Sequence, residues 1–408
     1  MLPFAAGLLL AGRPGPAGAT GFFIPDASAR AVAQGSAVVA GATDASAVFY
    51  NPAAIPFLDK DLNLLVGATT YFPQASYENP RTGATTDAEV EAFPVPYAYA
   101  TYRPVEGLGL GVGLNTRFGL GVTWPEKWEG YHLVEKSQLD STTLAVVASF
   151  APLDWFSLGV SFDTTFGAAE LSRGLDFGAE WGSFRFVGET VGFTASLGAY
   201  ARPADWVALG LAYHGPTTMT VKDGKADFDV PNRFDTMFPD QGGRVTITAP
   251  DIIWIGARFW PCASLSLELD VVQTQWHHYD KLEIEFDRGI GDEPLQTSEV
   301  QHNDWHDVLE LRLGAAWDTP LQGLSAYLGL IYEGQAVPAH RMDPSLPDNH
   351  RVDFSAGLSY AIWHFTIDVA YMFAYTLPRE VGTDDGNPFP ARYRSQSHVL
   401  GTAMSFAY

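Results

Sequence analysis

From Leu62 to the C-terminus, most of the chain alternates apolar residues with small, polar or charged ones. Along 265–271, for example, three leucines and a valine alternate with Ser266, Glu268 and Asp270. A period of two is the pattern of a β-strand whose two faces meet different surroundings. A soluble antiparallel sheet and a membrane barrel both produce it, so the alternation alone leaves both open.

The connections between these stretches are of two kinds. Short ones that carry a Trp alternate with long polar ones; the Trp residues are Trp155, Trp206, Trp260, Trp317 and Trp363. Short turns at one end, long loops at the other and aromatic residues at the interface are typical of a transmembrane β-barrel. The pattern predicts an all-β fold over residues 61–408, an antiparallel transmembrane barrel of about fourteen strands.

We place the predicted strands by the extent of each alternating stretch, with boundaries good to a few residues. They lie near 61–72, 94–103, 107–117, 138–151, 155–166, 187–202, 206–217, 247–260, 264–277, 304–318, 323–334, 351–361, 364–376 and 395–407.

Two segments precede the strands. Residues 1–19 combine an apolar core with Ala17-Gly18-Ala19, which predicts a cleaved secretory signal peptide; an ordinary disordered N-terminus is the alternative. Residues 20–60 are rich in Ala, Gly and Ser and have no period of two. We expect this second segment to form a partly helical plug, or hatch, inside the barrel.

Composition narrows the chemistry. The net charge of −23 argues against a nucleic-acid partner, and the single Cys262 excludes an internal disulfide framework and a Cys-rich zinc site. The sequence has no Gly-x-Ser-x-Gly elbow and no Walker loop. We interpret His277-His278 and the pair His302 and His306 as solvated histidines rather than metal ligands. No catalytic residue, metal or cofactor is predicted.

Several short blocks carry a family resemblance. Within the hatch the most specific is Asn51-Pro52-Ala53, and Arg117-Phe118-Gly119 and Leu346-Pro347-Asp348 follow in order. Together they resemble the FadL family of outer-membrane transporters for long-chain fatty acids and other hydrophobic compounds. The resemblance implies a barrel of fourteen strands, a hatch that closes the lumen, a kink in the third strand that opens the wall sideways, and diffusion of a hydrophobic ligand.

The predicted third strand is unusual. Gly107, Gly109, Gly111 and Gly113 share one face, and their missing side chains leave room for the hatch to approach. The family's kink then implies a lateral opening nearby, at Asn115, Arg117, Phe118 and Gly119. Hatch packing without any opening is the alternative.

Apolar residues in exposed loops can form a binding surface. We expect the loops at 167–187 and 218–247 to capture the ligand, and loop packing is the alternative; the candidate residues are Leu175, Phe177, Trp181, Phe184, Phe234 and Phe238. Phe22, Phe23 and Ile24 are candidates for an inner apolar pocket, and a shift of this segment is a candidate gate.

Charged residues on the inward face should pair within a confined lumen. This set consists of Arg258, Glu268, Asp270, Glu310 and Arg312. We interpret them as a network that ties the hatch to the wall, although an Arg could instead hold a carboxylate head group.

These observations predict an outer-membrane diffusion channel, not an enzyme, that passes fatty acids or aromatic hydrocarbons through a hatch-closed lumen. An aqueous porin and an outer-membrane phospholipase or esterase remain the alternatives. The expected partners are the hydrophobic ligand, outer-membrane lipid and lipopolysaccharide, and the barrel assembly machinery, which would recognise the aromatic C-terminal strand. We expect the barrel to act as a monomer.

Overall fold

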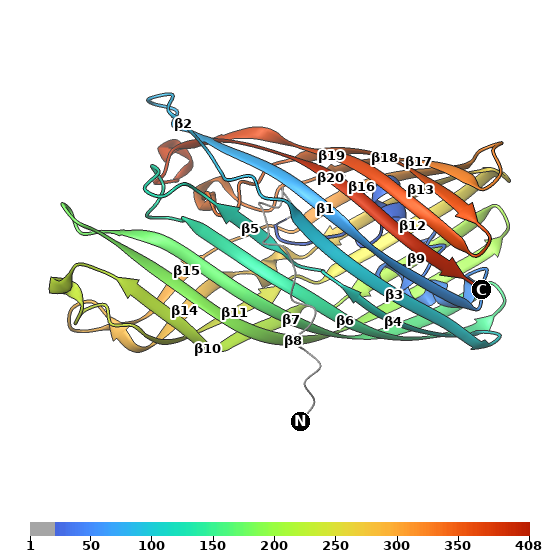
Figure 1. The fold of residues 1–408 in the computed structure, drawn as a ribbon, viewed down its shortest axis with the longest axis horizontal. Coiled ribbons are helices and arrows are strands. Elements are labelled where there is room, and N and C mark those ends of the chain that lie inside the picture. The colour runs from blue at the N-terminus through green and yellow to red at the C-terminus, as the bar shows by residue number, and fades with distance from the viewer. Residues whose placement is uncertain (1–20) are drawn as a thin grey trace.

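The wall of the molecule is one β-sheet that closes on itself. The computed structural model describes residues 21–408, and within this part of the chain twenty strand segments form one sheet, of which all but the short β2 make up a closed antiparallel barrel of fourteen wall strands (Figure 1). The first wall strand, β1, pairs with the last, β20, from Asn63–Ala407 to Glu78–Arg392, and this ladder closes the barrel. The predicted fold class is confirmed.

Five of the wall strands consist of two segments separated by a break. In wall order the strands are β1 (Leu62–Glu78), β3 (Phe93–Val105), β4 (Leu108–Asn115) with β5 (Leu120–Thr123), β6 (Lys136–Leu153), β7 (Phe156–Asp176), β8 (Trp181–Ala204), β9 (Val207–His214) with β10 (Thr217–Asp229), β11 (Gln241–Ala249) with β12 (Ile252–Cys262), β13 (Leu265–Thr274) with β14 (Lys281–Ile290), β15 (Gln296–His302) with β16 (Val308–Asp318), β17 (Leu324–Glu333), β18 (Arg351–Ile362), β19 (Phe365–Val381) and β20 (Ala391–Ala407). A short strand, β2 (Thr85–Asp87), pairs with the end of β1.

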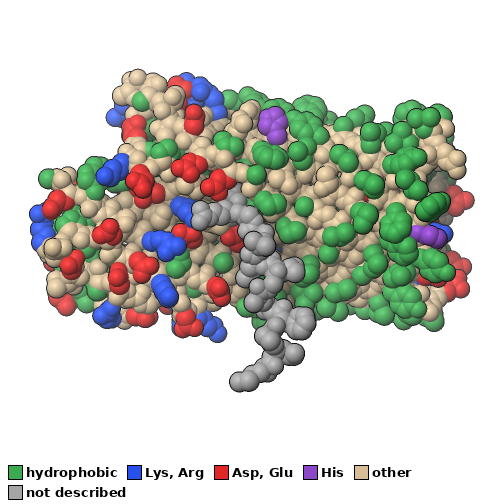
Figure 2. All heavy atoms as spheres, viewed as in Figure 1, with side chains coloured by type: hydrophobic (Ala, Val, Ile, Leu, Met, Phe, Trp, Pro, Cys, Tyr) green, Lys and Arg blue, Asp and Glu red, His purple; other side chains and the backbone are tan. Residues whose placement is uncertain are grey.

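The apolar face of the wall points outward. On β13, Leu267 and Leu269 are exposed, whereas Glu268 and Asp270 between them are buried in the lumen. Figure 2 shows the consequence as a broad apolar belt next to a charged end. A soluble sheet would bury its apolar face, so the exposed leucines decide between the two interpretations of the alternation. In the described residues, no helix is long and apolar enough to cross a membrane.

The two ends of the barrel differ. One end, the short-turn end, carries tight connections and the C-terminus (Figure 1). In or next to these connections, Trp155, Trp206, Trp317 and Trp363 are exposed, whereas Trp260 is half-buried against Arg202 and Arg258. The other, the long-hairpin end, extends well beyond the apolar belt. The Trp residues therefore gather at the short-turn end, as their positions at alternate turns predicted.

The prediction that residues 167–187 and 218–247 form long loops is wrong for most of these residues, because they belong to paired strands. At 167–187, β7 runs on to Asp176 and β8 begins at Trp181, with the two paired up to their tips. At 218–247, β10 and β11 form another paired hairpin, and β14 and β15 form a third. Beyond the lipid the outward face becomes polar, so the alternation of apolar residues fades although the backbone ladder continues.

The lumen holds the N-terminal segment. It contains α1 (Ala29–Ala33), α2 (Ala47–Tyr50) and the 3-10 helix η1 (Pro52–Phe57), and nearly every residue from Gly21 to Pro56 is buried. The hydroxyl of Ser28 caps α1 by accepting from the Ala31 N–H. The predicted signal peptide, residues 1–19, lies outside the described residues. Short 3-10 helices also occur outside the hatch, at η2 (Asn232–Phe234), η3 (Trp276–His278), η4 (Ala339–Arg341) and η5 (Thr383–Asp385).

Candidate functional site: the hatch and the breaks in the wall

The third wall strand is broken in the middle. β4 and β5 both pair with β6, and the residues between them, Thr116–Gly119, leave the ladder. We call this stretch the first break. It holds Arg117, Phe118 and Gly119, three residues of the predicted lateral opening, and Asn115 ends β4 beside it.

The start of the hatch fills the first break. The Ile24 N–H donates to the Arg117 carbonyl oxygen at 2.8 Å, and the Gly119 N–H donates to the Phe22 carbonyl oxygen at 2.8 Å. Phe23 and Phe118 thus face each other as an isolated antiparallel bridge. Two features that were predicted separately, the inner apolar segment and the lateral opening, are in direct backbone contact.

The side chain of Phe22 lies among aromatic rings from the opposite part of the wall. Its ring centroid is 4.8 Å from that of Trp276 and 5.2 Å from that of Tyr279, and Trp305 lies 6.3 Å away. On its other side, the Phe118 ring is at 6.0 Å. Edge-to-face contacts at these separations are favourable aromatic pairs. Sequence reasoning missed the three wall aromatics, because only the closure of the barrel brings them to the N-terminus.

A buried polar cluster supports the first break from inside. The Arg117 Nη2 donates to Asp163 at 3.1 Å, and Asp163 also accepts from the Ser196 hydroxyl at 2.7 Å. The Nδ1 of His214 lies 2.9 Å from the same hydroxyl. Among the described atoms, Arg117 Nε and Nη1, both amide atoms of Asn115 and His214 Nε2 have no hydrogen-bond partner.

This cluster contains a serine, a histidine and an aspartate, but their arrangement differs from a catalytic triad. In a triad the carboxylate binds the imidazole, which it orients toward the serine. Here the Asp163 carboxylate binds Ser196 and Arg117 instead. The arrangement therefore braces Arg117 and gives no geometric argument for an esterase.

A collar of wall glycines seats the hatch. A Cβ atom built on Gly159 would lie 2.6 Å from the Ala53 nitrogen, and one on Gly314 would lie 2.8 Å from the Gln34 carbonyl oxygen. Comparable close approaches between wall and hatch occur at Gly109, Gly111, Gly113, Gly198, Gly210, Gly329, Gly357 and Gly401. The predicted packing of the hatch on the third strand is thus one part of a ring of contacts. Gly107, by contrast, lies in the turn before β4.

Asn51 joins the hatch to the wall. Its side-chain amide donates to the carbonyl oxygens of Val39 at 2.9 Å and Ala199 at 3.1 Å, and its Oδ1 accepts from the Ala53 N–H. Pro52, like Asn51 and Ala53, lies against Gly198 of β8. The most specific block of the sequence is therefore a fixed point of the hatch.

The predicted lumen charges are all buried and point inward. Glu268 accepts from the Ala40 N–H at 2.7 Å and Asp270 from the Val39 N–H at 3.1 Å, while Arg258 donates to the Gly41 carbonyl oxygen at 2.6 Å. These three contacts tie the hatch to β12 and β13.

The other two lumen charges, Glu310 and Arg312, do not tie the hatch to the wall as predicted. Arg312 forms its ion pair with Glu310 on the same strand, and within the described residues neither side chain is hydrogen-bonded to the hatch. A further tie comes from the hatch residue Arg30, which pairs with Asp368 of β19 at 3.0 Å. Burial would favour neutral side chains, so each of these charges depends on its partner.

The predicted capture residues fall into two groups, which Phe238 links by its contact with Phe228 at 5.9 Å, and one further contact. Phe177 stacks on Phe234 and contacts Phe238, all at the tips of the long hairpins. Phe184 and the half-buried Leu175 belong to a second cluster between these hairpins, in which Phe184 contacts Phe228 and Phe286. Trp181 is half exposed and packs on Tyr131, away from both.

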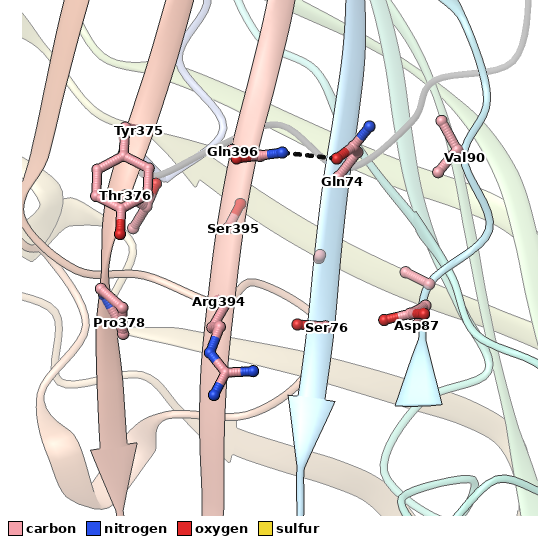
Figure 3. A pocket seen from close by; sticks show the side chains of 12 residues that line it. Gln74, Ser76, Asp87, Val90, Tyr375, Thr376, Pro378, Arg394, Ser395 and Gln396 are labelled. Carbon is pink, nitrogen blue, oxygen red and sulfur yellow. Dashed lines mark hydrogen bonds between the residues drawn. The ribbon is translucent and has the colours of Figure 1, made fainter. Parts of the chain in front are cut away.

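A groove of about 420 Å³ lies on the outside of the wall (Figure 3). It is lined from β1, β19 and β20 and from the segment around β2, and a hydrogen bond between Gln396 and Gln74 crosses it. None of the predicted ligand residues lines it. It is therefore separate from the hatch and the lumen.

Comparison with known proteins agrees with this architecture. A family model described as "Outer membrane protein transport protein (OMPP1/FadL/TodX)" matches residues 14–408. The chain belongs to this family. Its members are outer-membrane proteins, and this chain is accordingly a β-barrel of the bacterial outer membrane.

Individual relatives of the OMPP1/FadL/TodX family are distant in sequence. The long-chain fatty acid transport protein of Salmonella typhi is 21% identical, over 90% of this chain and 89% of its own. A FadL homologue of Pseudomonas aeruginosa superimposes with a TM-score of 0.83 at 17% identity, covering 95% of this chain and all of that one. The Pseudomonas putida toluene transporter TodX gives 0.72 at 16% identity, covering 94% and 98%.

Two neighbouring histidines between β13 and β14 each lie against an aspartate. His277 pairs with Asp307 at 2.8 Å and His278 with Asp251 at 3.0 Å. Throughout residues 21–408, no group of three or more His, Cys, Asp or Glu is arranged to hold a metal ion.

Proposed function

We propose that this protein is a diffusion channel that carries hydrophobic compounds across the outer membrane and releases them sideways through the first break. The observation that carries the proposal is the occupation of this break by Phe22–Ile24. A backbone segment that ends at the mature N-terminus can leave a wall position without disturbing a closed ladder. The long-hairpin end is then extracellular and the short-turn end periplasmic.

The seat of the hatch supports a sideways route over a straight one. The glycine collar brings hatch and wall backbones into contact around most of the lumen, and Asn51, Glu268 and Asp270 add hydrogen bonds. Moving the whole hatch would break all of these contacts together. Displacing Phe22–Ile24 breaks the two backbone hydrogen bonds to the first break and the contacts of three side chains.

Capture begins at the long hairpins. Phe177, Phe234 and Phe238 form an aromatic contact at their tips, where a hydrophobic solute first meets the protein. The inner pocket is the aromatic surroundings of Phe22. The Arg117 guanidinium lies over the Phe49 ring, and its two nitrogens without a partner would donate hydrogen bonds to a ligand oxygen, which would satisfy buried groups that otherwise carry a desolvation cost.

The ligand is a fatty acid or a small aromatic hydrocarbon. The relative from Salmonella typhi is named for long-chain fatty acids and TodX for toluene, and both classes suit an aromatic pocket. Lipopolysaccharide and outer-membrane lipid surround the apolar belt. The aromatic end of β20 serves recognition by the barrel assembly machinery, and the barrel works as a monomer.

A reversible cross-link tests this function. Phe23→Cys with Phe118→Cys, in a Cys262→Ser background, joins the two bridge partners and holds the N-terminal segment in the first break. Cells that lack transporters of this family are supplied with radiolabelled oleate or toluene. We expect uptake above empty cells in the reduced protein, loss on oxidation, and recovery with dithiothreitol. Uptake that is equal in oxidised and reduced protein would contradict the lateral route.

A further inference from the structure

Among the other breaks in the wall, one faces the first break across Phe22. The ladder between β13 and β16 ends at the pair Thr274–Val308, and the ladder between β14 and β15 begins at Lys281–His302. Between them, 275–280 and 303–307 are not paired as strands. We call these two stretches the second break.

One backbone hydrogen bond, from the Asn303 N–H to the Asp280 carbonyl oxygen at 2.8 Å, and several side chains close the second break in place of a continuous ladder. The backbone N–H of His277 donates to the carboxylate of Asp307 at 3.1 Å instead of to a neighbouring strand, and the Asn303 side chain donates to the Tyr279 carbonyl oxygen. On the lumen side, Trp276, Tyr279 and Trp305 fill the space, with Trp276–Trp305 ring centroids 5.0 Å apart. Trp276 is fully buried, whereas Tyr279 and Trp305 are half-buried and pack against the lumen core.

The second break lies at the border of the apolar belt on the side of the long-hairpin end. Toward the short-turn end, the outward residues Leu309, Leu311 and Leu313 are exposed and apolar. Toward the long-hairpin end, Lys281 and Glu283 on β14 form an ion pair that is partly exposed. A solute leaving the lumen here would meet the boundary between the hydrocarbon layer and the polar surface.

We infer that the second break is a second lateral passage for the hydrophobic ligand, closed from outside by the contact between His277 and Asp307. This inference rests on the proposed function. Phe22 contacts both breaks, through Phe118 on one side and Trp276 on the other. A ligand that displaces the Phe22 ring therefore lies next to two places where the wall has no ladder.

The physical reason is the difference between the two kinds of seal. Opening a continuous strand ladder exposes a row of backbone donors and acceptors, which lipid cannot satisfy. Opening the second break separates His277 from Asp307, whose side chains are 51% and 36% exposed, and rotates aromatic side chains. It also breaks two hydrogen bonds of Asn303, one from its backbone N–H and one from its side chain, instead of a whole row of ladder bonds. Exposed ion pairs are weak, so this part of the wall is the easier one to open.

A matched pair of disulfides tests the second passage. His277→Cys with Asp307→Cys, in the Cys262→Ser background, links the two sides of the second break. Gln273→Cys with Leu309→Cys is the control, since these residues face each other directly on the uninterrupted ladder below and both point outward. Oleate and toluene uptake is measured in oxidised and reduced cells, and heat-dependent gel mobility verifies that each barrel is folded.

We expect oxidation to reduce the initial uptake rate of the 277–307 variant, dithiothreitol to restore it, and the 273–309 control to transport equally in both states. Unchanged uptake in the oxidised 277–307 variant, with active reduced protein, would overturn the second passage and leave the proposed function intact. No uptake by the Cys262→Ser protein itself would remove the proposed function, and the second passage with it.

Discussion

The backbone N–H of Ile24 donates a hydrogen bond to the carbonyl oxygen of Arg117 at 2.8 Å. This bond joins the start of the hatch to the break in the third wall strand. Arg117 is itself held by the buried carboxylate of Asp163, so the wall side of the contact is fixed while the hatch side ends at a free N-terminus after the predicted cleavage. Movement at this contact is therefore expected in the hatch residue and not in the wall.

Deleting Gly21–Ile24 should reduce uptake of oleate or toluene without unfolding the barrel. The deletion removes Phe22 from its aromatic surroundings and the backbone partners of Arg117 and Gly119, but no strand of the wall. Uptake is measured in cells, and heat-dependent gel mobility reports the folded barrel. Normal uptake by the shortened protein would show that this segment is neither gate nor pocket.

Gly210→Ala should destabilise the protein by about 1–3 kcal/mol, the usual cost of forcing extra atoms into a packed interior. The new Cβ would lie 2.7 Å from the backbone nitrogen of Ala40, which has little freedom to move. Gly382→Ala is the control, because a Cβ there meets no described atom within 4 Å. Denaturant midpoints in detergent compare the two, and equal midpoints would contradict a tightly seated hatch.

Asn51→Asp should be more destabilising than Asn51→Ala. The alanine variant loses three hydrogen bonds and leaves buried groups unpaired, a cost of about 1–3 kcal/mol for each unsatisfied group. The aspartate keeps the acceptor for the Ala53 N–H but places a buried negative charge against the carbonyl oxygens of Val39 and Ala199. Denaturant midpoints give the order, and an aspartate variant as stable as wild type would disprove this role.

The loop around Asp348 should loosen as pH rises. The buried Asp348 accepts from the N–H groups of Ala336 and Val337, each at 2.7 Å. Burial raises the pKa of its carboxyl from 3.8 to about 6, outweighing those donors and Arg379, which act to lower the pKa. The folded loop therefore binds the proton more tightly than the unfolded chain does, and its stability falls as pH increases from about 4 to about 6.

Hydrogen exchange at Ala336 and Val337 tests this expectation. After correction for the intrinsic rate, exchange should be faster at pH 7 than at pH 5 in wild type. Asp348→Asn cannot titrate, so its corrected rates should be equal at the two pH values. Equal protection of the wild-type loop at both values would contradict the raised pKa.

The structure of the wall could largely be predicted from local pattern. Period-two alternation around Leu267 and Glu268, taken together with the Trp residues at alternate turns, predicted which face meets lipid and which face carries Arg258 and Asp270 into the lumen. Alternation is a property of neighbouring residues, and a strand turns its side chains to opposite faces wherever it lies in a sheet. The full length of the long hairpins was not predicted, because beyond the lipid the outward face is polar and the strands no longer alternate apolar with polar residues.

The candidate site was only partly predictable. Phe22 and Phe118 were each chosen from the sequence, but their contact, and the surroundings of Trp276, Tyr279 and Trp305, depend on barrel closure. The sequence by itself determined a strand wall with an apolar outer face, a small-residue plug and an inward set of charges, because these follow from residue type and spacing. Tertiary structure alone decided where the ladder breaks and what fills each break, because strand register brings together residues far apart in the chain.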